Sequence, residues 1–142
     1  MATTDANDFV RSMGIATSGL RAQSGRMRVI SENIANSSST AATAGGDPYR
    51  RKVPTFSSEL DRTLDARVVT LGKIRPDQSA FHVKYEPSNP AADVSGNVKY
   101  PNVNPMIEMT DMREAQRSYE ASLNIISATR RMIQRTLDIL KT

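Results

Sequence analysis

The placement of proline is the feature that most limits how this chain folds. All seven prolines lie between Pro48 and Pro105, and the segments before and after contain none. Proline breaks a helix interior because it lacks the backbone N–H and its ring clashes with the preceding turn. Both ends of the chain are therefore free to form long helices, while the middle is not.

Apolar residues repeat along the N-terminal segment with alternating spacings of four and three residues. This spacing is typical of a helix with a coiled-coil seam. The positions are Phe9, Met13, Ala16, Leu20, Met27, Ile30 and Ile34, with Gln23 at the one polar step. The glycines at positions 14, 19 and 25 weaken such a helix by about 1 kcal/mol each relative to alanine.

The C-terminal segment repeats the pattern. Asn104 suits the N-cap of a helix, and Pro105 suits its first turn. The seam consists of Met109, Met112, Tyr119, Leu123, Ile126, Ile133, Leu137 and Leu140, with Gln116 and Arg130 as polar steps. A second row comprises Ala121, Ile125, Ala128, Met132 and Ile139. Because this apolar face is wider than one partner helix covers, we expect the seam residues Met13, Leu20, Met27, Ile30, Ile34, Met109, Met112, Tyr119, Leu123, Ile126, Ile133 and Leu137 to form subunit interfaces.

The middle of the chain is expected to be irregular with some β structure. A strand is predicted over Arg67–Ile74, and the alternation of Phe81, Val83 and Tyr85 predicts a half-buried strand. Val98 and Tyr100 alternate similarly, which indicates a hairpin with a long tip or strands of a small sheet. The predicted class is α+β, with two long terminal helices pairing as a coiled-coil-like unit. Its segments are a helix over 1–36, a flexible linker over 37–47, a middle region over 48–104 and a helix over 105–142, with the two helices forming one core domain.

Composition narrows the possible functions. The chain has 142 residues, of which 38% are hydrophobic and 5% aromatic, so a large core is not expected. It contains no cysteine, which excludes disulfides, thiolate metal sites and thiol catalysis. The N-terminus resembles no secretory signal because Asp5, Asp8 and Arg11 interrupt it, and no apolar run is long enough for a membrane span.

Three groups of polar residues are candidate sites of chemistry. His82 is the only histidine, and it shares a polar strand face with Lys84, which favours a solvated surface residue. Glu108, Asp111 and Glu114 suggest a metal or acid–base pair, but acidic residues at a helix start more simply offset its dipole. Arg50, Arg51 and Lys52 suit a phosphate contact, but no motif for nucleic-acid recognition accompanies them. The sequence therefore predicts no catalytic residue, metal site or cofactor.

Four stretches resemble the flagellar basal-body rod proteins, and the resemblance covers nearly the whole chain. They are SGLRAQSGRMRVISENIAN (18–36), DPYRRK (47–52), VKYEPSNPAADVSGNVKYPNVN (83–104) and EMTDMREAQRSYEA (108–121). The third stretch is the most discriminating and is closest to subunits of the proximal rod. Ile34 stands where leucine is commoner in the family. The motif residues expected to make contacts through loops are Tyr49, Tyr85, Pro87, Pro90, Asp93, Gly96, Pro101 and Asn102.

This resemblance implies a function that composition does not show. Members of the family leave the cell uncleaved through the flagellar type III export apparatus and polymerise in the periplasm. They form the rod that transmits torque from the inner-membrane ring to the hook and filament, and their terminal helices pack against neighbouring subunits. The implied partners are further copies, other rod proteins, the hook–basal body adaptor protein and the inner-membrane ring.

Other interpretations of the residues remain open. One is a monomeric helical bundle with a loose middle. Another is a small soluble adaptor or export chaperone, although the proline-rich middle counts against a wholly helical protein. A third is a basic DNA-compacting protein, since the formal charge is +4, but the charges are dispersed and do not form one cationic face.

Overall fold

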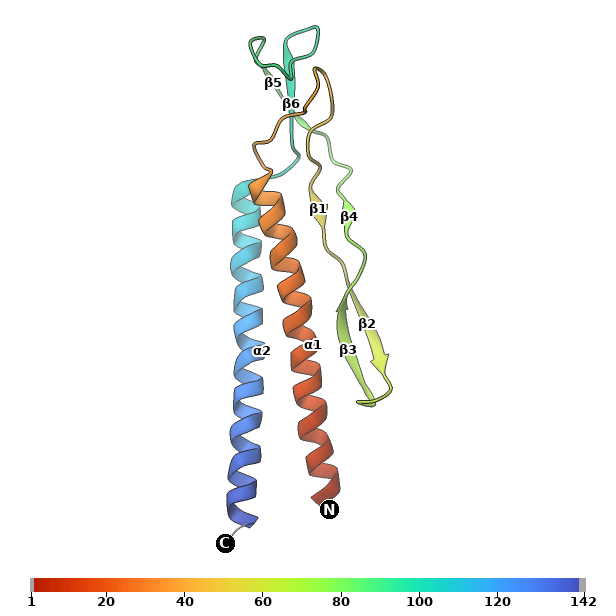
Figure 1. Ribbon diagram of the computed structural model, residues 1–142, viewed down its shortest axis with the longest axis vertical. Coiled ribbons are helices and arrows are strands. Elements are labelled where there is room, and N and C mark those ends of the chain that lie inside the picture. Colours follow the sequence, from red (N-terminus) through yellow and green to blue (C-terminus); the bar gives the residue numbers. More distant parts are fainter. Residues whose placement is uncertain (1, 141–142) are drawn as a thin grey trace. The chain divides into compact units, whose positions relative to one another are not determined.

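The structure is a computed structural model that describes residues 2–140. In chain order, a region of short antiparallel strands lies between two long helices (Figure 1), which confirms the predicted α+β class. The predicted helical residues Met1, Lys141 and Thr142 lie outside the described residues. The elements are, in order, α1 (Ala2–Ala35), β1 (Lys52–Val53), β2 (Phe56–Asp61), β3 (Ala66–Leu71), β4 (Arg75–Pro76), β5 (His82–Tyr85), β6 (Asn97–Tyr100) and α2 (Pro105–Leu140).

The chain divides into two compact units, and each helix contributes to both of them. Unit 1 contains the described residues 2–26, 56–72 and 114–140, and unit 2 contains residues 27–55 and 73–113. None of the described helices is both long and apolar enough to span a membrane.

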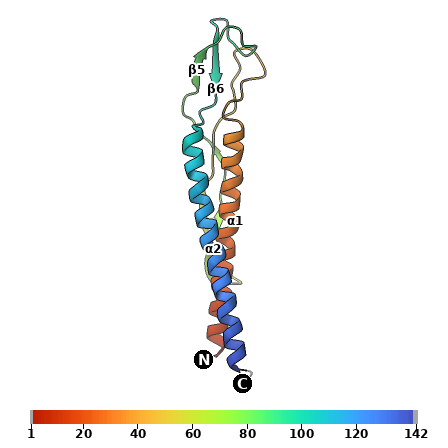
Figure 2. The same cartoon turned by 90° about the vertical axis from the view of Figure 1, so that its left-hand side faces the viewer.

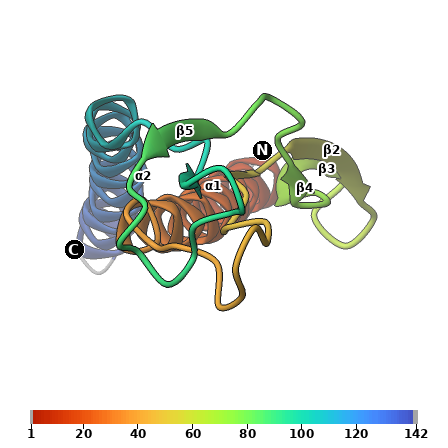
Figure 3. The same cartoon turned by 90° about the horizontal axis from the view of Figure 1, so that it is seen from above.

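Unit 1 has three layers, with α1 lying between α2 and the β2–β3 hairpin (Figure 3). The two helices run antiparallel, so that Arg26 on α1 forms an ion pair with Glu114 on α2 at 3.6 Å. In the hairpin, the paired residues run from Phe56 opposite Leu71 at the open end to Asp61 opposite Ala66 at the turn. The predicted strand at Arg67–Ile74 is thus present as β3, whereas β2 was not predicted.

Glycines on α1 allow the hairpin to approach closely. A Cβ atom added to Gly25 would lie 2.6 Å from Cδ2 of Leu71, and one added to Gly14 would clash with Leu64. The sequence predicts only that these glycines weaken the helix. The structure shows what offsets this cost: without side chains at Gly14 and Gly25, α1 leaves room for Leu64 and Leu71 of the hairpin to pack against it.

Unit 2 contains two further pairs of strands, β1 with β4 and β5 with β6. Figure 2 shows the second of these pairs. The β5–β6 pair confirms the predicted hairpin with a long tip, which runs between Tyr85 and Asn97. The predicted half-burial of β5 is wrong, because all four of its residues are exposed. Val98 of β6 is fully buried instead, and it pairs with Lys84 of β5. Opposite residues of paired strands share a face of the sheet, so Val83 and Tyr85, the neighbours of Lys84, lie on the other, outward face.

The start of α2 is formed as predicted. Asn104 accepts a hydrogen bond from the backbone N–H of Met106 through its side-chain oxygen at 3.0 Å, and Pro105 is the first helical residue. An N-cap of this kind satisfies a backbone donor that the helix itself cannot pair.

Candidate assembly surfaces

In unit 1, the face of α2 that meets α1 is built from small side chains. Ala115 and Thr129 are buried, and a Cβ atom added to Gly19 of α1 would lie 3.3 Å from Oγ of Ser122. Buried alanine and threonine side chains remove little apolar area from water. The two helices therefore approach closely, and the fully buried residues of their contact contribute little hydrophobic stabilisation.

Larger apolar side chains lie on both sides of this seam. At about 100° per residue, Leu123 and Leu137 fall on one flank of the seam and Ile125, Met132 and Ile139 on the other, at angles of roughly 60° to 100° from its centre. All five are exposed, from 42% for Leu123 to 75% for Ile139. The helix thus presents two apolar flanks that its own chain leaves uncovered.

The structure distributes the predicted seam residues among three environments. Ile30 is buried within the chain. Met109, Leu123 and Leu137 are exposed. The others are half-buried, and they are Met13, Leu20, Met27, Ile34, Met112, Tyr119, Ile126 and Ile133. The periodic pattern identifies apolar positions correctly, but it does not separate those facing α1 from those facing outward, because both lie on neighbouring stripes of one helix.

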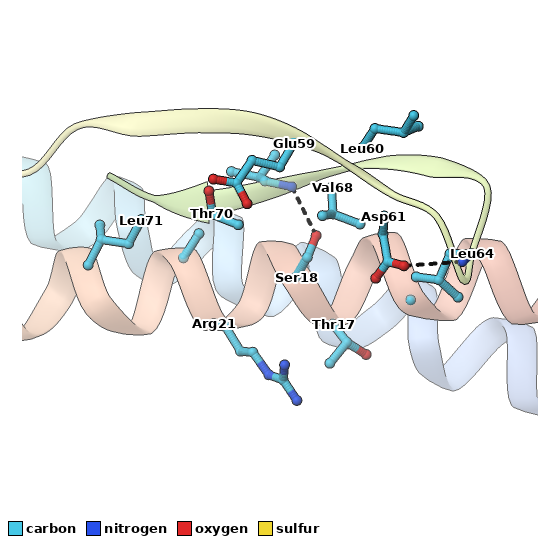
Figure 4. A pocket seen from close by; sticks show the side chains of 13 residues that line it. Thr17, Ser18, Arg21, Glu59, Leu60, Asp61, Leu64, Val68, Thr70 and Leu71 are labelled. Atoms are coloured by element: carbon cyan, nitrogen blue, oxygen red, sulfur yellow. Dashed lines mark hydrogen bonds between the residues drawn. The ribbon is translucent and has the colours of Figure 1, made fainter. Parts of the chain in front are cut away.

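The β2–β3 hairpin is attached to α1 by its turn and by one strand edge. Arg11 donates to the carbonyl oxygen of Leu64 at 3.0 Å and to the carboxylate of Asp65 at 2.9 Å. The backbone N–H of Val69 donates to Oγ of Ser18 at 3.2 Å (Figure 4). A pocket of about 600 Å³ lies between the hairpin and α1, while Leu60 points away from α1. Its charged lining residues are Arg21, Glu59 and Asp61.

Unit 2 is held together by a buried polar network around Glu108. This glutamate is 1% exposed and accepts hydrogen bonds from Nε of Arg51 at 2.6 Å and from Nδ2 of Asn33 at 3.1 Å. Asn33 also accepts bonds from the hydroxyl of Tyr49 at 2.8 Å and from the backbone N–H of Lys52 at 3.0 Å. The network joins the end of α1, the β1 segment and the start of α2 through fully paired polar groups.

The charges and hydrogen bonds of the network favour the protonated, charged form of Arg51. Burial disfavours the charge on Arg51, but its hydrogen bond to Glu108 and the charges of Glu108, Asp77 and Asp111 outweigh this effect and raise its pKa. Burial, followed by the charges of Glu32 and Glu108, raises the pKa of Tyr49 to about 12. Tyr49 is therefore a protonated hydrogen-bond donor at neutral pH.

These contacts change the interpretation of two sequence clusters. Glu108 does lie in the first turn of α2, but its carboxylate serves the buried ion pair and not only the helix dipole. The basic cluster is used within the chain: Arg51 pairs with Glu108, and Lys52 pairs with Glu32. Arg50 lies over the ring of Phe81, 4.2 Å from its centroid.

The motif residue Asn102 connects three backbone segments. Its Oδ1 accepts from the N–H of Arg51 at 2.8 Å, and its Nδ2 donates to the carbonyl oxygen of Asp77 at 3.1 Å and to Oγ of Ser79 at 2.8 Å. Pro101, beside it, is buried. These two motif residues therefore act inside unit 2, as does Tyr49.

The other motif residues shape the loop between β5 and β6, residues 86–96. Asp93 accepts bonds from the N–H groups of Ser95 and Asn97, at 2.8 and 2.9 Å. Gly96 has a φ of 79°, and a Cβ added there would lie 2.8 Å from Cε2 of Tyr85. Pro87 and Pro90 are exposed. His82, on β5, is exposed as the sequence predicts.

Two groups of residues in these surfaces were not found from the sequence. The first is the network of Asn33, Arg51 and Glu108, and the second is β2 with its exposed Phe56 and Leu60. Glu108 lies seven residues before Ala115 and shares its helix face. Ala115 lies outside both predicted apolar rows, so the periodic pattern does not predict the burial of Glu108.

Comparison with known proteins agrees with this architecture. The family model described as "Flagella basal body rod protein" matches residues 13–42, and the one described as "Flagellar basal body rod FlgEFG protein C-terminal" matches residues 94–139. Both ends of the chain thus have the sequence of a flagellar basal-body rod protein.

Similar proteins extend the match to nearly the whole chain. A flagellar basal-body rod protein FlgC of Agrobacterium fabrum is 54% identical over 127 residues, covering 89% of this chain and 91% of that protein. FlgC of Bacillus subtilis is 37% identical, covering 92% and 97%, and FlgC of Salmonella typhimurium is 35% identical, covering 88% and 92%. The chain belongs to the FlgC family of flagellar basal-body rod proteins, and it is a structural rod subunit of the flagellar basal body.

Proposed function

We propose that this chain is a subunit of the proximal part of the rod and polymerises through its terminal helices. The resulting tube spans the periplasm and transmits motor torque. The subunit leaves the cytoplasm through the flagellar type III export apparatus without a cleaved signal peptide. Its partners are further copies, other rod proteins, the inner-membrane ring and the hook–basal body adaptor protein. Its role is mechanical and involves no catalysis.

One observation carries the proposed mode of assembly: α2 exposes larger apolar side chains on both flanks of a seam whose buried residues are small. Burial of apolar surface is the main driving force for association. The uncovered flanks are therefore the part of the helix whose burial by neighbouring subunits would release the most free energy. Two flanks suit two neighbouring subunits. We place Leu123 and Leu137 in one of these contacts, and Ile125, Met132 and Ile139 in the other.

The predicted segment division and interface residues form part of this proposal. The helices over 1–36 and 105–142 act as one core domain, and 37–47 acts as the linker to the middle region over 48–104. The half-buried seam residues at the edges of the α1–α2 contact complete the interfaces, together with exposed Met109.

The proposal is tested by placing a charge on one flank. Leu123→Asp buries an unpaired carboxylate in the proposed contact, which is strongly unfavourable, so the variant should be exported but absent from isolated basal bodies, and cells should not swim. The matched control is Asn124→Asp, which adds the same charge at the neighbouring exposed position outside both flanks. Normal swimming with Leu123→Asp, at normal expression, would show that this flank is not buried in the rod.

A further inference from the structure

The loop between β5 and β6 holds one apolar side chain fully in solvent. We call residues 86–96 the tip loop. Its Val94 is 108% exposed, although the loop around it is well ordered by hydrogen bonds. Besides the two bonds to the Asp93 carboxylate, the N–H of Asp93 donates to the carbonyl oxygen of Asn97 at 2.9 Å, and the N–H of Glu86 donates to that of Gly96 at 2.9 Å. A turn fixed in this way presents Val94 at little cost in conformational entropy.

The tip loop is also acidic. Glu86 and Asp93 are its only charged residues. Hydrogen bonds from Asn89 and Tyr100 lower the pKa of Glu86. The hydrogen-bond partners of Asp93 within the turn are neutral backbone groups. The exposed apolar residue is therefore accompanied by negative charge.

Unit 2 also has a groove in which cations outnumber acids among the charged lining residues. It has a volume of about 730 Å³, and we call it the Ile74 groove. Its apolar lining residues are Tyr49, Ile74 and Pro76, and its charged lining residues are Glu32, Arg50 and Lys52. Ile74 is 42% exposed and lies in sequence between two exposed cationic residues, Lys73 and Arg75. No residue of the tip loop lines this groove.

The two surfaces complement each other in charge and polarity. The tip loop offers Val94 next to Asp93. The groove offers Ile74, which has Lys73 and Arg75 on either side of it in sequence, and its charged lining residues are two cations and one acid. The pocket between the hairpin and α1 is a poorer match, because its charged lining residues are two acids and one arginine. Like charges brought together across an interface are unfavourable, so the acidic tip loop favours the Ile74 groove.

We propose that the tip loop of one copy docks in the Ile74 groove of the next copy, with Val94 against Ile74 and Asp93 near Lys73 and Arg75. This inference rests on the proposed self-assembly of the chain. The two contacting surfaces are different parts of the molecule, so the contact is head-to-tail, and repetition without closure gives an open helical polymer. The contact is small relative to stable interfaces. It therefore sets the register between copies, whose association is driven by the helices.

Disulfide cross-linking tests the contact directly, because the chain has no cysteine of its own. Val94→Cys and Ile74→Cys variants, carrying different tags, are co-expressed in cells lacking the native chain, and their isolated basal bodies are mildly oxidised. We expect a thiol-sensitive dimer carrying both tags, since a disulfide requires Cα atoms about 4.4–6.8 Å apart. The control pairs Val94→Cys with Leu60→Cys, an exposed residue of β2 that points away from α1, and should give no dimer.

Electrostatic complementarity is tested by Arg75→Glu in the Ile74→Cys background. The yield of cross-linked dimer should fall several-fold, whereas Arg62→Glu, at an exposed residue of the β2–β3 turn, should leave it unchanged. If both cysteine variants are present in basal bodies but no dimer forms, or if Val94→Cys links to Leu60→Cys instead, the inference is overturned and the proposed function stands. If the native chain is absent from basal bodies, the proposed function fails and the inference fails with it.

Discussion

Glu108 shows how one buried carboxylate can determine the local structure of unit 2. Burial of a charge is costly unless it is paired and hydrogen-bonded, and Glu108 receives both Arg51 and Asn33. Removing one partner costs more free energy of unfolding than the intact pair contributes, because the remaining buried group is left without its hydrogen bond. The network therefore acts mainly as a constraint on which segments meet.

Glu108→Gln should lower the free energy of unfolding of unit 2 by about 2–4 kcal/mol, because Arg51 loses its closest charged partner in a partly buried site. The measurement is urea unfolding followed by tyrosine fluorescence. Glu114→Gln is the control, since Glu114 is largely exposed and its ion pair with Arg26 should contribute less than about 1 kcal/mol. Equal effects of the two substitutions would contradict the assigned role of Glu108.

Asp77 gives unit 2 a predictable response to acid. A backbone hydrogen bond from Ser79, a side-chain bond from Ser79 and the charge of Arg51 lower its pKa below the ordinary value of 3.8. Because the folded pKa lies below the unfolded one, this contribution to stability is fully present above about pH 4 and disappears as the pH falls through the folded value. Unfolding measured between pH 2 and 6 should depend less steeply on pH in Asp77→Asn than in the native chain. An unchanged slope would exclude this contribution.

At the scale of the elements, local patterns and long-range contacts differ in how well sequence reveals them. Both helices and the β5–β6 hairpin follow from proline placement and periodicity, which are local properties. Strand β2, FSSELD, was missed because its polar residues do not alternate cleanly with its apolar ones. The contact between Glu108 and Arg51 joins residues 57 positions apart. A single sequence carries no signal for a partner that far away, so the site built around it emerged only from the structure.

The turn at Gly96 allows a test of the tip loop as an element. Gly96→Ala should destabilise the loop by about 1–2 kcal/mol, because φ is positive and the added Cβ would meet Tyr85. Ser95→Ala, one residue earlier and exposed, should change little, since only the backbone N–H of Ser95 is used in the turn. Amide hydrogen exchange of residues 86–97 is the measurement. Unaltered protection in Gly96→Ala would show that the loop tolerates another conformation.

At the scale of the whole molecule, the two units differ in what holds them together. The largest fully buried side chains are Val29, Asn33, Val98, Pro101 and Glu108, and all belong to unit 2. Among the side chains of unit 1 that the structure describes, the buried ones are small and are Ala16, Ala22, Ala115 and Thr129. Unit 1 also carries the uncovered flanks of α2. We therefore expect its order to depend on burial that other subunits supply.

We expect the free subunit to be folded mainly in unit 2. Fixing a helix costs about 1–2 kcal/mol of backbone entropy per residue, and buried alanines offset little of this in unit 1. Amides of residues 7–26 and 114–139 should exchange rapidly in the dilute chain, while those around Asn33 and Val98 exchange slowly. In isolated basal bodies both sets should be protected, because neighbours then cover the flanks. Circular dichroism of the free chain should accordingly show less helix than the 34 and 36 residues of α1 and α2. Slow exchange throughout a monomeric chain, with cooperative melting of full helix content, would instead identify a self-sufficient bundle and remove the reason for assigning the flanks to other subunits.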